Sequence, residues 1–344
     1  MTKAPFAGLA VQDLRVEFDL YGGITKVLDG INLCVDTNQR VGVVGETGCG
    51  KSLTMMTALG MLRRPPARIV GGEILFDGRN VLAMSHRELR RLRGSRMSIV
   101  FQDPMTSLNP VFTIRKQMEF VVRRARFARN TRGRKSFALL ESALEEMNLP
   151  DPRRILSSYP MQLSGGMRQR VLIAMAIINK PDLLFADEIG TALDVTVQAQ
   201  VIRQLEALVL QRGMALVAIS HNLGVIRQLC EHVYVMYAGQ VVEEAPSDEL
   251  FRCPLHPYTR ALIEALPRLT GGSLSKGIPG RIPDYSDPPT GCRYNPRCAL
   301  SNPSCEVRPP IQDAGAKHTY ACIHAPAHLA AKYGTEARVR GAAS

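Results

Sequence analysis

Hydrophobic and polar positions in the first hundred residues alternate in short runs that are separated by turn residues. The sequence Tyr21-Gly22-Gly23 is typical of a turn between two such runs, and Pro65-Pro66 is typical of a helix stop. This part is therefore predicted to be mainly β-structure around one helix, with strands at 9–18, 27–35, 40–45, 72–78 and 97–101 and the helix at 51–62.

The pattern changes at about residue 103. Residues 103–180 have helical periodicity with little strand signal, and from residue 182 strands and helices alternate, which favours a mostly parallel sheet with crossover helices. The apolar runs at 41–44, 183–186 and 215–219 lack polar alternation, as expected for strands that are buried on both faces. The predicted helices are 113–129, 136–147, 165–179 and 195–211, and the strands are 183–187, 214–220, 232–237 and 240–243.

Composition narrows the class of protein. The chain has 344 residues, 45% of them hydrophobic and 22% charged, which is typical of a globular protein of about two domains. Its apolar runs are far shorter than the ~20 residues that cross a bilayer. The N-terminal residues lack the basic and apolar regions of a signal peptide, so we do not expect secretion. Clustered cysteines in a reducing compartment are more often metal ligands or catalytic groups than disulfides.

The formal net charge is +12, and part of the excess lies in the basic run from Arg123 to Lys135. Such runs usually form a solvated surface, which is the interpretation we favour. An anionic membrane surface and nucleic acid are the alternative partners of a basic protein. The chain has no tryptophan on which bases would stack.

Residues 45–52 read GETGCGKS and match the G-x-x-x-x-G-K-[ST] phosphate-binding motif between a predicted strand and a predicted helix. Glycines allow the backbone N–H groups to approach phosphates, and the helix N-terminus favours anions. Lys51 is expected to reach the β- and γ-phosphates, and Ser52 to ligate Mg²⁺. We interpret Cys49, inside the loop, as a small filler and not as a nucleophile. The loop comprises Gly45, Glu46, Thr47, Gly48, Cys49, Gly50, Lys51 and Ser52.

The segment LLFADE at 183–188 is an apolar strand that ends in two carboxylates. Asp187 is expected to hold Mg²⁺ through water. Glu188 is expected to orient the attacking water or to accept its proton, a role worth about 10²–10⁴ in rate.

The segment LSGGM at 163–167 lies between these two motifs and precedes an apolar helix. With it, the chain from about residue 9 to its end resembles the ATP-binding cassette family. The resemblance implies an α/β fold: a P-loop NTPase nucleotide-binding domain with a RecA-like mixed sheet core, an N-terminal antiparallel β-subdomain and a helical subdomain. It also implies that ATP and Mg²⁺ are the cofactors.

The resemblance assigns roles to further residues. Gln102 matches the loop that senses the γ-phosphate through Mg²⁺, and His221 matches the switch histidine that contacts the γ-phosphate. Ala192-Leu193-Asp194 matches the D-loop. The signature residues Ser164, Gly165 and Gly166 are implied to cap the ATP of an opposing subunit, so that two cassettes are needed to complete a site.

Four positions depart from the family pattern or match it loosely. Ile189 and Gly190 replace the usual Pro-Thr after the catalytic glutamate, which removes a rigid turn residue and loosens the turn. Leu53 replaces the common Thr or Ser after Ser52. Tyr21 is the nearest candidate for the aromatic residue that stacks on adenine.

The segments QDPMTSLNP (102–110), HPYT (256–259), IPG (278–280) and GCRYNPRC (291–298) resemble the dipeptide and oligopeptide importer branch, which includes nickel systems. The resemblance implies an ATPase subunit that powers the uptake of dipeptides, oligopeptides or a related small solute. It would be peripheral on the cytoplasmic face of the inner membrane, with a second cassette, two permeases and an extracytoplasmic binding protein as partners. We predict a nucleotide-binding domain at 1–266, with its helical subdomain at 103–180, and a small irregular Cys-rich extension at 267–344. Met105, Leu108 and Phe112 are candidates for contact with short permease helices, with a place in the core as the alternative.

The extension holds four of the eight cysteines, spaced C-x5-C-x6-C-x16-C, which is not the paired spacing of a zinc ribbon. Four cysteines hold either Zn²⁺ or an Fe–S cluster in proteins. Resemblance to some dipeptide-importer ATPases favours a [4Fe–4S] cluster, and zinc, free thiols and a disulfide are the alternatives. The four residues are Cys292, Cys298, Cys305 and Cys322.

Two other functions agree less well with the sequence than the importer does. A soluble cassette ATPase that acts on nucleic acid or ribosomes agrees with the basic charge, but the chain has a single cassette, no long coiled coil and the importer-like HPYT segment. An iron–sulfur redox protein with a vestigial cassette disagrees with the intact Lys51, Glu188, Ser164 and His221. We therefore expect no nucleic acid partner.

Overall fold

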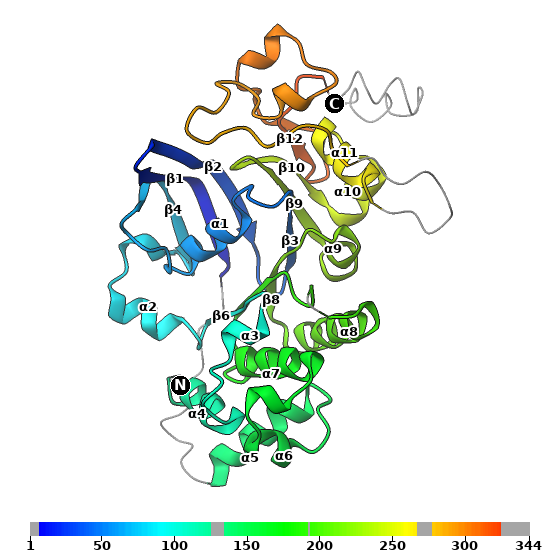
Figure 1. Ribbon diagram of the computed structural model, residues 1–344. Coiled ribbons are helices and arrows are strands. Elements are labelled where there is room, and N and C mark those ends of the chain that lie inside the picture. Colours follow the sequence, from blue (N-terminus) through cyan, green and yellow to red (C-terminus); the bar gives the residue numbers. More distant parts are fainter. Residues whose placement is uncertain (1–6, 125–133, 192, 267–276, 325–344) are drawn as a thin grey trace. The chain divides into compact units, whose positions relative to one another are not determined.

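The computed structural model describes residues 7–124, 134–191, 193–266 and 277–324 (Figure 1). The chain divides into two compact units, each of which is described by itself. The first unit covers the described residues of Met1–Leu9, Val35–Arg40 and Leu75–Ile219, and the second covers those of Ala10–Cys34, Val41–Ile74 and Ser220–Ser344.

Three parallel strands form the centre of the first unit: β6 (Met97–Val100), β7 (Leu183–Asp187) and β8 (Ala215–Ile219). Val100 lies opposite Ala186, and Asp187 lies opposite Ile219. Every residue of β7 and β8 is buried. The prediction that these apolar runs form strands covered on both faces is therefore confirmed.

Between β6 and β7, the named elements of the described residues are all helices, as predicted for the helical subdomain. Some of these helices begin at residues whose side chains accept an N–H group of the first turn, such as Ser164 before α7 and Asp151 before α6. The helices of the first unit are α2 (His86–Leu92), α3 (Pro104–Ser107), α4 (Ile114–Arg124), α5 (Arg134–Glu145), α6 (Pro152–Ser157), α7 (Gly165–Ile177) and α8 (Val195–Arg212), with 3₁₀ turns η1 (Val81–Ala83) and η3 (Pro160–Gln162).

In the second unit, β1 (Leu9–Leu20) and β2 (Gly23–Val35) form a hairpin around a turn at Tyr21, as predicted, and β1 also neighbours β4 (Ala67–Phe76). In the first unit, β5 (Arg79–Asn80) pairs antiparallel with the last two residues of β4. The helix α1 (Lys51–Ala58) is shorter than the predicted 51–62. It ends before Gly60, which has a positive φ of 62° that a continuing helix does not accommodate.

The second sheet of this unit has the order β11-β12-β10-β9-β3. The strand β3 (Arg40–Val44) is parallel to β9 (His232–Tyr237), and the other neighbours are antiparallel. The strands β10 (Gln240–Pro246), β11 (Gln312–Asp313) and β12 (Thr319–Tyr320) complete the sheet, and the helices are α9 (Leu223–Leu229), α10 (Ser247–Arg252) and α11 (Pro257–Glu264).

Residues 277–324 contain little regular structure apart from β11, β12 and the 3₁₀ turns η4 (Asn295–Arg297) and η5 (Pro303–Glu306). The backbone is close-packed where a Cβ on Gly291 would lie 2.2 Å from the Cys305 carbonyl oxygen. These elements form the mixed α/β fold predicted for an ATP-binding cassette. None of the helices in the described ranges combines the length and apolar character that crossing a bilayer requires.

Candidate functional site

The phosphate loop, residues 45–52, turns between the end of β3 and the start of α1 in the second unit. Gly45 has a φ of 149°, and a Cβ there would lie 2.1 Å from the Met236 carbonyl oxygen. Gly50 caps α1 in the left-handed region with a φ of 103°. Only glycine satisfies both the space and the backbone conformation at these positions.

Lys51 folds back over the loop instead of extending into water. Its Nζ donates to the carbonyl oxygens of Gly45 at 2.8 Å and Glu46 at 2.9 Å, and it lies 3.7 Å from the sulfur of Cys49. Cys49 is fully buried, and this burial raises the pKa of its thiol. A buried neutral thiol is a poor nucleophile, which favours the interpretation of Cys49 as a filler.

The other predicted residues of the second unit are more accessible. Ser52 is exposed in the first turn of α1, and Leu53 is half-buried. His221 is exposed just before Asn222, which caps α9. Tyr21 is fully exposed at the β1–β2 turn.

Three side chains from the C-terminal third of the chain hold the phosphate loop, and the sequence patterns did not assign them to it. Arg297 makes two hydrogen bonds to the carboxylate of Glu46, at 2.6 Å and 3.0 Å. The Tyr258 hydroxyl accepts the Glu46 N–H at 2.8 Å, and the Tyr285 hydroxyl donates to the Gly48 carbonyl oxygen at 2.8 Å. Tyr258 lies in the importer-like segment HPYT (256–259) and Arg297 in GCRYNPRC (291–298), whereas Tyr285 lies in neither.

The HPYT segment builds the start of α11. His256 is its cap and accepts the Tyr258 N–H at Nδ1, Pro257 occupies the first turn, and Tyr258 is buried against Tyr237 with a ring distance of 4.6 Å. The motif thereby fixes the ring whose hydroxyl reaches the phosphate loop.

In the first unit, Gln102 and Asp187 follow or end two neighbouring parallel strands. Val100 of β6 pairs with Ala186 of β7, so the residues that come next lie at the same carboxyl edge. Asp187 is 8% exposed, whereas Gln102 is exposed before α3. This edge brings Gln102, Asp187 and Glu188 into one region of the first unit.

Glu188 occupies the left-handed region with a φ of 48°, a conformation that costs about 1–3 kcal/mol and that recurs at active sites. Its N–H donates to the Ile219 carbonyl oxygen at 2.8 Å, and its own carbonyl accepts the Thr191 hydroxyl at 2.5 Å. Gly190 also has a positive φ, of 84°, and Ile189 is buried. The turn after the glutamate is therefore held by burial and hydrogen bonds in place of the usual proline.

The signature residues and the D-loop lie together in the first unit. Ser164 caps α7 by accepting the Met167 N–H at 3.3 Å. A Cβ on Gly165 would lie 3.4 Å from Leu193, and one on Gly166 would lie 2.7 Å from Val197 of α8, so both glycines permit close packing. Asp194 caps α8 by accepting the Val197 N–H at 2.9 Å. Ala192 lies outside the described residues.

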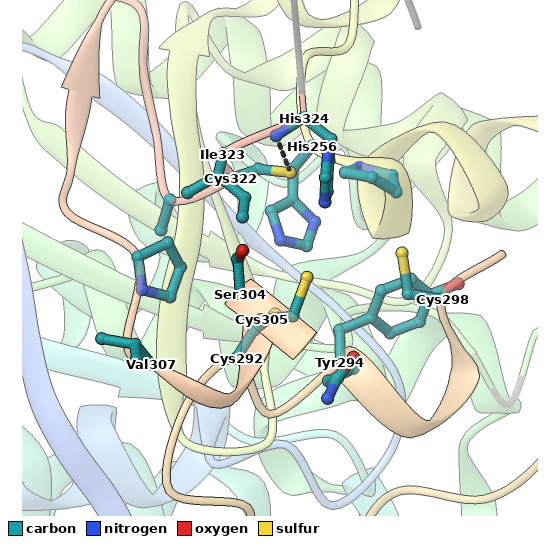
Figure 2. A pocket seen from close by; sticks show the side chains of 14 residues that line it. His256, Cys292, Tyr294, Cys298, Ser304, Cys305, Val307, Cys322, Ile323 and His324 are labelled. Atoms are coloured by element: carbon teal, nitrogen blue, oxygen red, sulfur yellow. Dashed lines mark hydrogen bonds between the residues drawn. The ribbon is translucent and has the colours of Figure 1, made fainter. Parts of the chain in front are cut away.

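The four late cysteines line one cavity in the second unit, together with His256 and His324 (Figure 2). All eight cysteines of the chain are free thiols, which excludes the disulfide in this structure. Burial and the neighbouring cysteines raise the pKa of Cys292 to about 11. Within the described ranges, however, no three His, Cys, Asp or Glu side chains are gathered as ligands of a metal ion. Four cysteine thiols are the ligands that an Fe–S cluster uses, but in this structure they are not gathered closely enough to hold one metal ion together.

The predicted docking positions differ in exposure. Met105 is 49% exposed, and Phe112 is half-buried with its ring 6.2 Å from that of Phe120. Leu108 is 2% exposed, so the prediction that it contacts a permease helix is wrong. It belongs to the hydrophobic core, which was the alternative. The middle of the basic run, residues 125–133, lies outside the described residues.

Comparisons with known proteins agree with these features. The ABC transporter family matches residues 28–191, and the oligopeptide/dipeptide transporter C-terminal region matches residues 242–305. A probable peptide ABC transporter ATP-binding protein of Sinorhizobium fredii is 44% identical over 91% of this chain and 94% of its own length. The dipeptide transport ATP-binding protein of Bacillus subtilis is 38% identical over 91% of this chain and 93% of its own.

Solved structures show the same fold. A dimeric ATP-binding cassette bound to ADP and phosphate has a TM-score of 0.62 at 24% identity and covers 70% of this chain and 98% of its own. A cassette of a Clostridium perfringens ABC transporter complex has a TM-score of 0.58 at 24% identity, covering 71% of this chain and 90% of its own. The peptide-transport relatives favour the importer over the nucleic acid alternative.

Proposed function

Since this chain belongs to the ABC transporter family and is the ATPase subunit of a peptide importer, we propose how its residues bind and hydrolyse ATP. The observation that carries this proposal is the phosphate loop with Lys51 folded back over it, so that the Lys51 Nζ donates to the carbonyl oxygens of Gly45 and Glu46. ATP and Mg²⁺ are the expected cofactors of this family. With ATP bound, Lys51 would contact the β- and γ-phosphates in place of its loop carbonyls, Ser52 would ligate Mg²⁺, and residues 45–50 and Leu53 would surround the phosphates. Tyr21 is the candidate to stack on adenine.

The carboxyl edge of the first unit supplies the hydrolytic groups. We assign Mg²⁺ coordination to Gln102 and to Asp187 through water, and we assign the orientation and deprotonation of the attacking water to Glu188. His221 contacts the γ-phosphate. The catalysis is positioning and charge neutralisation of a transferring phosphoryl group.

The ATP site is completed by a second cassette. Ser164, Gly165 and Gly166 are proposed to cap the ATP that is bound to the phosphate loop of the partner, and Asp194 is proposed to take part in the same interface. Hydrolysis then separates the two cassettes, which couples the chemistry to movement.

The family implies membrane permeases as partners. We further propose that an extracytoplasmic binding protein delivers the solute to them. We propose that the chain is a peripheral protein on the cytoplasmic face of the inner membrane, with 1–266 as the nucleotide-binding domain and 267–344 as the extension. A pull-down of the tagged chain from native membranes in mild detergent tests this. Two multi-span permeases and a cassette support the proposal, whereas ribosomes or nucleic acid without a permease overturn it.

A [4Fe–4S] cluster at Cys292, Cys298, Cys305 and Cys322 is a separate and narrower proposal. It rests on the shared cavity and on the resemblance to dipeptide-importer ATPases. Anaerobic purification that yields about four irons per chain, with absorbance at about 400 nm, supports the cluster. Bound zinc in place of iron, or iron-free thiols, refutes it, and a variant with all four cysteines changed to serine is the matched control.

A further inference from the structure

The segment from 277 to 324 contacts the phosphate loop directly, although it lies more than two hundred residues further along the chain. The Arg297–Glu46 pair joins residues 251 positions apart, and the Tyr285–Gly48 hydrogen bond joins residues 237 apart. We propose that Arg297 and Tyr285 are positioning residues of the nucleotide site, which hold the phosphate loop in the shape that receives ATP. This inference rests on the proposed role of the loop in nucleotide binding.

Arg297 is held on every side of its guanidinium. Besides the two bonds to Glu46, its Nε donates to the Pro279 carbonyl oxygen at 2.8 Å, and its Nη2 donates to the Ile278 carbonyl oxygen at 3.1 Å. Nη1 also lies 3.3 Å from the Tyr237 hydroxyl. The Arg297 side chain is 4% exposed, so the paired geometry with Glu46 is fixed by packing as well as by charge.

Glu46 is thereby fixed through both its side chain and its backbone. Arg297 holds the carboxylate, and Tyr258 accepts the N–H. The carbonyl oxygen of the same residue is one of the two that Lys51 contacts. Because these groups belong to one residue, a shift of the Arg297 pair displaces an acceptor of the lysine that is proposed to bind phosphate.

Tyr285 holds a second residue of the loop, Gly48. Its hydroxyl holds the Gly48 carbonyl oxygen, and its own carbonyl accepts the Lys26 N–H at 2.8 Å. The C=O and N–H of one planar trans peptide point in opposite directions. Fixing the Gly48 carbonyl therefore turns the Cys49 N–H toward the inside of the loop, where it lies 3.2 Å from the Glu46 carbonyl oxygen.

Gly48 needs the hydrogen bond from Tyr285 because it has no side chain that could pack and fix its backbone. It has a φ of 86°, and no atom lies within 4 Å of the position of a Cβ. A glycine in open space loses more backbone entropy on ordering than any other residue. A loop that is ordered in advance binds its ligand more tightly, since less ordering is left to the binding step.

The test is nucleotide affinity in the purified full chain, measured by titration with a fluorescent ATP analogue and confirmed by the KM for ATP. Arg297→Gln is expected to raise Kd roughly five- to twentyfold and to change kcat at saturating ATP by less than about twofold. Tyr285→Phe is expected to raise Kd by about two- to fourfold. Arg297→Lys, which keeps the charge but not the paired geometry, is expected to recover only part of the loss.

The matched control is Arg308→Gln. Arg308 belongs to the same segment but pairs with Asp29 at 3.2 Å, so its loss is expected to leave Kd unchanged. If Arg297→Gln does not fold, Glu46→Gln tests the same pair from the loop side. In a double variant that folds, the two effects are expected not to add, because each removes the same interaction.

Lys51→Ala separates this inference from the proposed function. If the parent chain does not bind the nucleotide, or if Lys51→Ala binds it as well as the parent, the proposed function fails. If the parent binds and Lys51→Ala does not, but folded Arg297→Gln and Tyr285→Phe have the parent's Kd or a lower one, the positioning role is refuted.

Discussion

Glu243 is the buried acceptor that joins three separate segments of the second unit. It is 1% exposed on β10, and its two carboxyl oxygens accept the N–H groups of Leu255 at 2.7 Å and His256 at 2.8 Å. His318 Nε2 lies 2.7 Å from one of the same oxygens. Glu243→Gln places an NH₂ donor where one acceptor oxygen was, so that a buried N–H faces another donor.

The size of the effect follows from these contacts. A buried donor left without an acceptor costs about 1–3 kcal/mol, and one carboxyl oxygen of Glu243 serves both the Leu255 N–H and His318 Nε2. Glu243→Gln keeps one acceptor oxygen, so we expect the free energy of unfolding to fall by about 2–4 kcal/mol. At about 2–4 °C per kcal/mol, Tm falls by about 5–15 °C in thermal unfolding followed by circular dichroism. A Tm within about 1 °C of the parent refutes the reasoning.

The neighbouring Glu244 is the matched control, because its substitution by Gln is expected to change the stability in the opposite direction. Burial raises the pKa of Glu244, because it disfavours the carboxylate. The folded chain therefore holds this proton more tightly than the unfolded chain does. The contribution of Glu244 to the free energy of unfolding is therefore lost as the pH rises above the unfolded pKa of about 4.3 and through the higher pKa of the folded chain. Glu244→Gln is expected to melt at or above the parent at pH 8, and this advantage is expected to vanish near about pH 4.

Three further predictions concern the nucleotide site. Glu188→Gln is expected to bind ATP with the parent's affinity but to hydrolyse it about 10²–10⁴ times more slowly in a phosphate-release assay, and an unchanged rate contradicts its role. Gly166→Ala places a Cβ 2.7 Å from Val197 and is expected to lower ATPase activity, with recovery in the double variant with Val197→Ala; no recovery would show that packing is not the reason for the glycine. Cys49→Ala is expected to keep ATPase activity within about threefold, and complete loss would identify the thiol as essential.

The sequence predicted the features that depend on local pattern. The apolar runs at 183–186 and 215–219 identified buried strands, because a strand covered on both faces has no polar alternation. The glycine spacing of residues 45–52 identified the phosphate loop, because Gly45 and Gly50 occupy backbone conformations that other residues avoid.

Features that depend on long-range packing were not predicted. Leu108 has the same apolar character as Met105, and only the fold shows that the first is buried and the second is exposed. Arg297 lies in the cysteine-containing segment 291–298, and its neighbours in the sequence do not indicate a partner 251 residues away. The positive φ of Glu188 also had no local signal, since the turn is held by Ile219 from a neighbouring strand.

The central claim is that ATP hydrolysis by this chain drives peptide import, and transport tests it most directly. The chain is reconstituted into liposomes with the permeases that co-purify with it, and uptake of a labelled peptide is measured with ATP supplied on the side of the cassettes. We expect uptake that requires ATP and that is lost with Glu188→Gln. Peptide uptake that continues unchanged with Glu188→Gln, or ATP hydrolysis that moves no peptide in the complete complex, would contradict the account.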